Sequence, residues 1–232
     1  MSLNENSLAY WFPAVQVAGI PHPHTEIVEV GWQPLISILD QKRLPEAVEV
    51  QVVQAAERIG FPLFLRTDQA SGKHHWRQGC HVPALTELWP HIFQVVEENA
   101  IADLDCTALV FRELLTLESM FTAFEGLPIA KERRYFVSDG EVRCHHAYWP
   151  EGAIENGWSR APLPDDWREQ LAALNIEAAD EICELTALAE KLRLPGSWSV
   201  DFAFAVDRGW VLLDMALAEQ SWHPECPYRL AE

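Results

Sequence analysis

The spacing of apolar residues predicts a strand, a helix and a second strand in the first third of the chain. Residues 25–30 (TEIVEV) alternate between apolar and polar positions, as a half-buried strand does. In residues 46–60 the apolar positions recur at steps of three and four, which is typical of an amphipathic helix, and Gly60 ends the pattern. The short apolar run at 62–65 predicts a buried strand that leads into a polar, glycine-containing loop.

Three other segments of this half have less regular patterns. The first 45 residues are rich in Pro and Trp, and we expect them to be extended. Residues 82–100 have helical spacing, but Pro90 predicts a break or a kink. Residues 106–115 (CTALVFRELL) predict a buried strand that ends in charged residues.

The C-terminal half combines hairpins with helices. Residues 132–149 alternate on both sides of Asp139-Gly140, a dipeptide typical of a tight hairpin turn. Residues 166–192 predict one long amphipathic helix or a pair of helices. Residues 197–222 contain two apolar strands around the turn at 207–209. Helices that alternate with antiparallel hairpins predict an α+β fold.

Charge and composition limit the class of protein. The chain has 232 residues, of which 49% are hydrophobic and 22% charged, as in folded globular proteins. Its 17 basic and 35 acidic side chains give a net charge of −18. Binding to nucleic acid requires a basic face, so we expect no nucleic-acid partner.

The termini and cysteines favour a cytoplasmic location. The start, MSLNENSLAY, has no pattern of a secretory signal, and no apolar stretch has the length that a membrane helix needs, so we expect no membrane partner. The five cysteines are odd in number and scattered without a CxxC motif, which favours a reducing compartment over a disulfide framework.

The segment from Arg66 to Lys73 is a candidate phosphate site. Arg66 ends a buried strand, and the small residues Ser71 and Gly72 precede a second cation at Lys73. Small residues let backbone N–H groups approach phosphate oxygens, while the side-chain charges neutralise them. The spacing is not that of a P-loop, and a solvated surface turn is the alternative.

Two acids in apolar strands are candidate metal ligands. Asp201 and Asp214 lie on neighbouring strands of the C-terminal hairpin, and a carboxylate in such surroundings needs a partner. Mg²⁺ commonly uses one or two carboxylates together with substrate phosphates. The alternative is a salt bridge from one of these acids to Arg66, Arg112 or Arg134.

Consecutive arginines begin the hairpin at 132–149. Alternation places Arg134 and Phe136 on one face of the strand, and Arg133 and Tyr135 on the other. An arginine that faces inward needs an anion, either in a buried ion pair or on a phosphate or carboxylate ligand.

In this order, the motifs resemble those of the ATP-grasp superfamily. GIPHPHTEIV is similar to its lead-in segment, FPLFLRT to its first phosphate-binding strand and SGKH to its flexible phosphate loop. VFRELL resembles the hinge strand, ERRYFVSDGEV the hairpin that follows, and SVDFAF with GWVLLDMA the metal-binding hairpin. The resemblance runs from residue 20 to 227, and Arg66 in place of the first lysine is similar to a bacterial and phage clade of the family.

The resemblance implies an ATP-grasp fold of two α+β lobes with a nucleotide cleft between them. Residues 1–45 would be a short lead-in segment and 46–232 the ATP-grasp domain, divided into a small lobe (46–112) and a large lobe (113–232). It also implies residue roles. Lys73 and Arg134 would be catalytic, with Arg134 on the γ-phosphoryl group, and the nucleotide would be bound by Arg66, Ser71, Gly72, Lys73, Glu113, Leu114 and Leu115.

The implied metal strand departs from the family pattern. Asp201 and Asp214 would hold Mg²⁺, but Ala216 stands where the family usually has an asparagine ligand. Glu219 or Glu225 could substitute, and we favour Glu219 as the third ligand.

The resemblance implies an ATP- and Mg²⁺-dependent ligase that joins a carboxylate to an amine, or another nucleophile, through an acylphosphate. A small-molecule, peptide or protein carboxylate would be the substrate. The alternative is a catalytically degenerate nucleotide-binding module that acts as an assembly factor with a protein partner. An unrelated α+β protein with structural ion pairs is a third reading.

Other histidines and cysteines suggest less. The pairs His74-His75 and His145-His146 lack the ligand spacing of a structural zinc site. A nucleophilic Cys–His pair, Cys144 with His146 or Cys226 with His223, has no third orienting group in the sequence.

Overall fold

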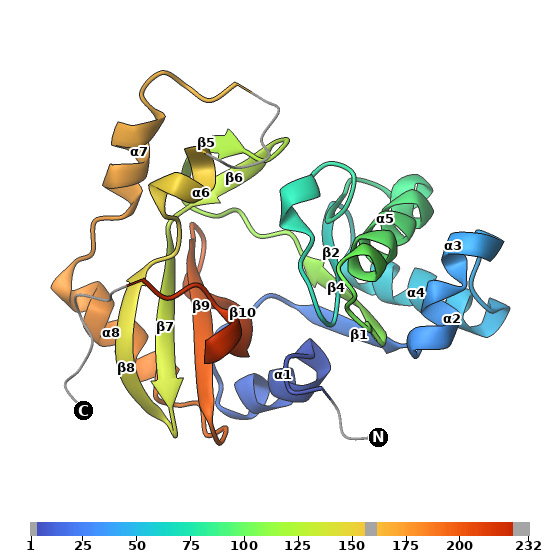
Figure 1. The fold of residues 1–232 in the computed structure, drawn as a ribbon, viewed down its shortest axis with the longest axis horizontal. Helices are drawn as coiled ribbons and strands as arrows, with labels where there is room; N and C mark the ends of the chain where they lie inside the picture. Colours follow the sequence, from blue (N-terminus) through green and yellow to red (C-terminus); the bar gives the residue numbers. More distant parts are fainter. Residues whose placement is uncertain (1–3, 156–161, 225–232) are drawn as a thin grey trace. The chain divides into compact units, whose positions relative to one another are not determined.

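The computed structural model describes residues 4–155 and 162–224 (Figure 1). The chain divides into two compact units. Unit 1 comprises Met1–His22, Thr116–Ala123 and Pro128–Glu232, and unit 2 comprises Pro23–Leu115 and Phe124–Leu127. The segment that we expected as a lead-in, residues 1–45, is therefore shared between the two units.

Unit 2 contains a four-stranded antiparallel sheet. Its strand order is β1-β4-β2-β3, and the strands are β1 (Thr25–Glu29), β2 (Leu63–Thr67), β3 (His81–Val82) and β4 (Ala108–Glu113). The predicted strands at 25–30, 62–65 and 106–115 are confirmed, with ends shifted by a few residues.

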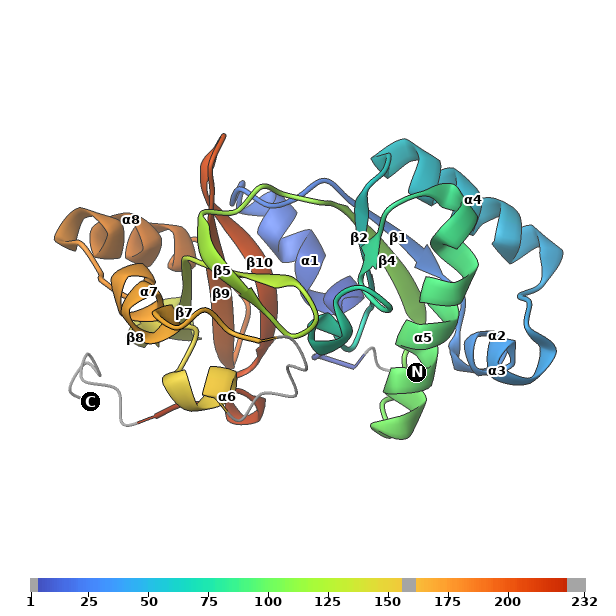
Figure 2. The ribbon, with the colours of Figure 1, turned by 90° about the horizontal axis from the view of Figure 1, so that it is seen from above.

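Two long helices pack on this sheet. They are α4 (Glu46–Ile59), which contacts β1 and β4, and α5 (Leu88–Ile101), which contacts β2 (Figure 2). Both helices belong to one apolar cluster with the sheet, because Val52, Ala56, Ile92, Val95, Leu65 and Phe111 are all buried in it. The short helices α2 (Trp32–Ile36) and α3 (Ile38–Gln41) add Leu35 and Ile38 to the same core.

The prediction of a break at Pro90 is wrong. Pro90 is the third residue of α5, which begins at Leu88 after a short 3₁₀ turn, η2 (Leu85–Glu87). The first backbone N–H groups of a helix have no partner inside the helix, so a proline there removes no hydrogen bond.

The prediction that the first 45 residues are extended is also wrong, because they contain helices α1 (Leu8–Val17), α2 and α3. In α1, Leu8, Trp11, Phe12 and Val15 are buried and follow the spacing of one helix face. Burial of this apolar face outweighs the cost of Pro13 inside the helix.

Unit 1 is built on a second antiparallel sheet, with strand order β10-β9-β7-β8. Its strands are β7 (Glu132–Ser138), β8 (Glu141–Ala147), β9 (Ser197–Ala205) and β10 (Gly209–Leu217). Both predicted hairpins are confirmed. Asp139 and Gly140 have φ angles of 52° and 81°, as the mirror-image turn of a two-residue hairpin requires. A short hairpin, β5 (Ser119–Ala123) with β6 (Leu127–Ala130), lies outside this sheet.

Helices cover one face of the unit 1 sheet. Of the two forms that we expected for 166–192, the structure shows the pair, α7 (Trp167–Leu174) and α8 (Ala179–Ala189). Helix α8 contacts β7 and β8, where buried Arg133 of β7 bonds Glu181 of α8. Tyr10 of α1 stacks on Trp198, which faces the same way as Arg133. Helix α6 (Glu151–Glu155) and the turn η3 (Ala218–Gln220) complete the described elements of this unit.

Within the described ranges, no helix combines the length and the apolar character that crossing a membrane would need.

Candidate functional site

A row of polar side chains crosses the helix-free face of the unit 1 sheet. Asp214 of β10 lies opposite Asp201 of β9, Asp201 lies opposite Arg134 of β7, and Arg134 lies opposite His146 of β8. Directly opposed residues of antiparallel strands point to the same face. The sheet register therefore places all of these side chains in one line.

The centre of the row is a two-pronged ion pair. Arg134 donates from Nε to Asp201 Oδ1 and from Nη2 to Asp201 Oδ2, both at 2.7 Å. Burial opposes the positive charge, but the charge and hydrogen bonds of Asp201 outweigh burial and raise the pKa of Arg134 above its usual value. The guanidinium group also lies over the ring of Tyr148, 4.7 Å from its centre. Of the two alternatives for the acids, the salt bridge to Arg134 is the one that the structure shows for Asp201.

The second acid is better placed for a cation. Asp214 is half-buried next to Asp201, and its Oδ1 accepts a hydrogen bond from the Met215 N–H at 3.0 Å. Two opposed carboxylates on one face fit Mg²⁺, which completes its shell with phosphate oxygens and water. Glu219 lies on η3, exposed to solvent. Among the described residues, no group of three or more His, Cys, Asp or Glu side chains is arranged to hold a metal ion by itself.

The segment after η3 lies over the same face. The Ser221 and Ser199 hydroxyls are 2.6 Å apart, and the ring of His223 stacks on Phe136 at 3.9 Å. Cys144 Sγ lies 2.8 Å from His223 Nε2. The structure thus pairs Cys144 with His223 and not with His146, while Cys226 and Glu225 lie outside the described residues.

His146, at the end of the row, is a site residue that the sequence did not reveal. It is 7% exposed, and its Nδ1 donates to the Ala147 carbonyl at 2.7 Å. A carbonyl can only accept, so Nε2 carries the lone pair, and this buried atom has no hydrogen-bond partner in the described part of the chain. Burial lowers the pKa of His146, so its ring is neutral near pH 7.

The predicted phosphate residues of unit 2 lie at one end of β2. Arg66 is 3% exposed, and its Nε donates to the Thr67 carbonyl at 2.9 Å. Asp68, fully buried, accepts hydrogen bonds from the backbone N–H groups of Thr107 and Ala108 and so joins the end of β2 to the start of β4. These contacts give the following loop a fixed starting point.

That loop carries Ser71, Gly72 and Lys73. Gly72 has a φ of 61°, in the left-handed region that favours glycine, and Lys73 begins the 3₁₀ turn η1 (Lys73–His75). His74 stacks on Phe124 with ring centres 4.8 Å apart. The structure therefore brings the small residues and Lys73 into one ordered turn that follows directly on Arg66 and β2.

The predicted adenine-binding residues follow β4. Glu113 and His24 form reciprocal contacts. The Glu113 N–H donates to the His24 carbonyl at 3.0 Å, and the His24 N–H donates to Glu113 Oε1 at 2.9 Å. Leu114 and Leu115 come next and are the last residues of this segment of unit 2.

Comparison with protein families gives one match over most of the chain. The model of an ATP-grasp domain, the third family of one clade of the superfamily, matches residues 55–230. No protein with a curated description matches the chain.

Solved structures share the fold at low sequence identity. The C-terminally truncated Cdc123 from Schizosaccharomyces pombe has a TM-score of 0.56 and 13% identity, over 92% of this chain and 83% of that one. Cdc123 from the same yeast has a TM-score of 0.53 and 11% identity, over 92% and 83% of the two chains. The D-alanine–D-alanine ligase from Bacillus anthracis complexed with ATP has a TM-score of 0.45 and 13% identity, over 91% of this chain and 54% of that one.

At these identities the structural likeness concerns the fold alone, whereas the family model covers the strands and loops that carry the site residues. The chain therefore belongs to the ATP-grasp superfamily, and its α+β architecture is an ATP-grasp fold.

Proposed function

We propose that this protein is an ATP- and Mg²⁺-dependent ligase that joins a carboxylate to an amine, or to another nucleophile, through an acylphosphate. The observation that carries the proposal is the line of Arg134, Asp201 and Asp214 on one face of the unit 1 sheet. Phosphoryl transfer depends mainly on positioning and charge neutralisation, and this line supplies a fixed cation beside two anionic ligands.

In this proposal the carboxylate substrate attacks the γ-phosphorus of ATP and ADP leaves. Arg134 neutralises the charge of the transferring group, and Asp201 and Asp214 hold Mg²⁺. When bound, the ion neutralises phosphate oxygens and aligns them for transfer. An amine then attacks the acylphosphate carbon and releases phosphate. Lys73 contacts the phosphates from the loop, and Arg66 contacts the α-phosphate.

The adenine ring would bind along the segment after β4, at Glu113, Leu114 and Leu115. The clamp between Glu113 and His24 supports this assignment, because it fixes the backbone on which hydrogen bonds to a base depend. Ser71 and Gly72 would bring backbone N–H groups to the phosphates.

Thermal unfolding with Mg²⁺·ATP tests the nucleotide site. Ligand at about 100 times its Kd stabilises a protein by roughly 2.7 kcal/mol, which for a chain of this size raises Tm by about 5–10 °C. Asp214→Asn should lose the Mg²⁺-dependent part of this shift. Asp207→Asn, in the exposed turn between β9 and β10, is the matched control and should keep it. A wild-type protein with no shift at millimolar ATP would refute the proposal.

The third metal ligand is tested by titrating Mg²⁺. If Glu219 takes the place of the asparagine missing at Ala216, Glu219→Ala should raise the Mg²⁺ concentration needed for the shift about tenfold, as for other weakened metal sites. An unchanged requirement would show that Glu219 is not a ligand.

The alternative, a nucleotide-binding assembly factor without ligase activity, is favoured by one feature, the alanine at position 216 of the metal strand. ADP release distinguishes the two functions. A ligase releases ADP from Mg²⁺·ATP when a pool of amino acids and short peptides supplies the carboxylate and amine. A factor binds ATP with the same Tm shift but shows no ADP release that depends on the pool.

A further inference from the structure

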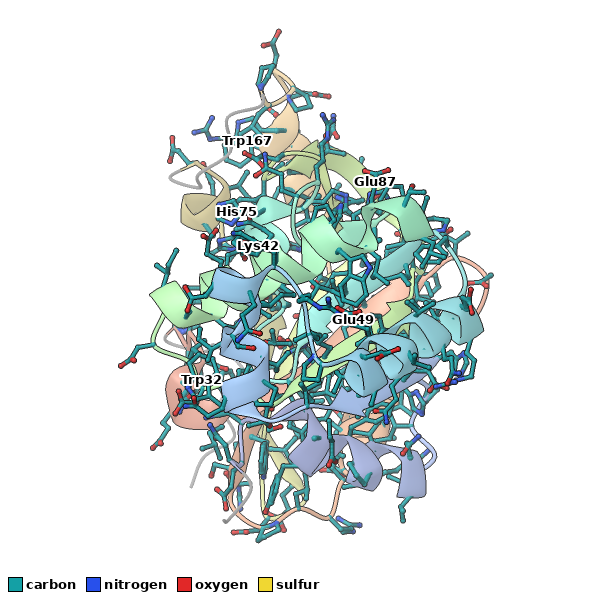
Figure 3. All side chains as sticks on the ribbon, turned by 90° about the vertical axis from the view of Figure 1, so that its right-hand side faces the viewer. Trp32, Lys42, Glu49, His75, Glu87 and Trp167 are labelled. Atoms are coloured by element: carbon teal, nitrogen blue, oxygen red, sulfur yellow. The ribbon has the colours of Figure 1, made fainter. Side chains whose placement is uncertain are left out.

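Helix α5 holds the loop that carries Lys73. Glu98 projects from α5, and its Oε1 accepts a hydrogen bond from His75 Nδ1 at 2.9 Å and one from Gln94 Nε2 at 2.9 Å. His75, labelled in Figure 3, is the last residue of η1, so this contact lies two residues beyond Lys73. The Glu98 side chain is only 17% exposed, whereas that of His75 is 45% exposed.

The loop backbone lies directly on the same carboxylate. A Cβ atom at Gly72 would be 2.9 Å from Glu98 Oε2, closer than a real side chain could come. A Cβ atom at Gly79 would be 3.1 Å from the His75 carbonyl oxygen and 3.6 Å from Glu98 Oε1. Glycine at both positions therefore allows the loop to close over Glu98.

A second side chain of α5 fixes the far end of the loop. His91 Nδ1 lies 2.7 Å from the Gly79 carbonyl oxygen, so it donates to that oxygen, and the Gly79 N–H in turn donates to the His75 carbonyl at 2.7 Å. The turn from Gly72 to Gly79 is thus attached to one rigid helix at His75 and at Gly79. Lys73 lies inside the attached turn.

Glu98 occupies an unfavourable place for a charge. Burial raises the pKa of Glu98, although Gln94 and His75 act in the opposite direction. A neutral residue at position 98 would suit the fold better, so the carboxylate serves something other than stability.

We propose that Glu98 and His75 form a latch that holds the Gly72–Gly79 turn in position for the terminal phosphates of ATP. Glu98 and His75 are thus positioning residues that act through Lys73. This inference rests on the proposed function, because it assumes that the loop binds phosphates. A loop that is already ordered loses less conformational entropy when its ligand binds, so the latch should increase affinity.

Nucleotide affinity measured by calorimetry tests the latch, with Mg²⁺·ATP and AMP as the two probes. Glu98→Ala and His75→Ala should each weaken ATP binding about three- to tenfold, the factor that one hydrogen bond to a charged group supplies. AMP lacks the terminal phosphates and keeps its contact with Arg66, so its affinity should not change.

Three comparisons separate a latch from general damage. The double variant should bind ATP no more weakly than either single variant, because both remove one interaction. Glu98→Gln can still accept a hydrogen bond from His75 and should recover most of the affinity. Glu97→Ala, the neighbouring glutamate of α5, is the matched control and should bind both nucleotides normally.

The outcomes are distinct. Equal losses for ATP and AMP, additive effects in the double variant, or unchanged ATP affinity in Glu98→Ala would each overturn the latch and leave the proposed function standing. A wild-type protein that binds neither nucleotide would overturn both. Hydrogen exchange of the loop amides gives an independent readout. Exchange should be faster in Glu98→Ala than in Glu97→Ala without any ligand, and equal rates would also overturn the latch.

Discussion

Replacing Arg133 by methionine should destabilise unit 1 far more than its single positive charge suggests. The Arg133 side chain is completely buried between β7 and α8. Its Nε donates to Glu181 Oε1 at 2.7 Å, and its terminal nitrogens donate to the carbonyls of Glu132, Leu174 and Ile176 at 3.0, 3.1 and 2.7 Å. Methionine fills much of the volume but supplies none of these donors.

The magnitude follows from the groups that are left behind. Removing one partner of a buried ion pair costs about 3–5 kcal/mol. Lys131 Nζ also lies 2.7 Å from Glu181, so this acid keeps one cation and we expect the lower end, about 3 kcal/mol. At roughly 2–4 °C per kcal/mol, the Tm of the transition that includes unit 1 should fall by about 6–12 °C.

The assay is calorimetric unfolding together with urea titration followed by tryptophan fluorescence. Arg168→Met is the matched control. It makes the same exchange at a half-exposed arginine whose partners Glu151 and Glu155 are also exposed, and it should leave Tm unchanged. Arg133→Lys should recover only part of the loss, since an ammonium group cannot reproduce the planar fork. A loss below about 1 kcal/mol for Arg133→Met, or an equal loss for Arg168→Met, would refute the assignment of Arg133 to stability.

Two further predictions concern pH. Because burial raises the pKa of Glu98, its charged form disfavours folding, so Glu98→Gln should be more stable than wild type at neutral pH, and the difference should vanish as pH falls below the unfolded pKa of the acid. Urea unfolding at a series of pH values checks this, and a gap that widens toward acid would contradict it. Because burial lowers the pKa of His146 from 6.5, wild type should lose stability as pH falls through 6.5, and His146→Gln should lose less over the same range. The same titrations decide this, and parallel curves for the two proteins would show that His146 does not titrate as inferred.

Local signals in the sequence were enough to predict most strands, the hairpin turns and the α+β class. Asp139-Gly140 is the clearest case, because only a residue pair that tolerates positive φ can make that turn. The N-terminal helix α1 was missed because Pro13 and the nearby prolines suggested an extended chain, although Leu8, Trp11, Phe12 and Val15 already had helical spacing. Apolar periodicity was the stronger signal there.

The site row could be predicted only in part, because one irregularity changes its membership. A regular hairpin closed by Asp139-Gly140 would place His145 opposite Arg134. The register shifts by one residue between Phe136 and Val137, so His146 takes that place and His145 turns to the other face, where it lies 3.3 Å from Glu177. A bulge of this kind exchanges the faces of all residues beyond it, and no local sequence pattern marked it.

The contacts around the phosphate loop were also beyond sequence analysis. Ser71, Gly72 and Lys73 were found from their own chemistry, but Glu98 and His91 lie on a helix whose spacing only marks it as amphipathic. Their importance follows from which face of α5 packs next to the loop, and tertiary structure decides that.

The order of segments along the chain affects how the protein can be assembled during synthesis. Unit 2 is almost one continuous stretch, from Pro23 to Leu115, whereas unit 1 begins with Met1–His22 and resumes at Thr116. Helix α1 contacts β10, and Asn6 Oδ1 accepts a hydrogen bond from the Leu217 N–H, 211 residues further on. During translation α1 emerges first but must wait for β10, with its apolar face exposed, while unit 2 can already fold. A chaperone that shields residues 8–15 at the ribosome would therefore benefit this protein more than one that acts on unit 2.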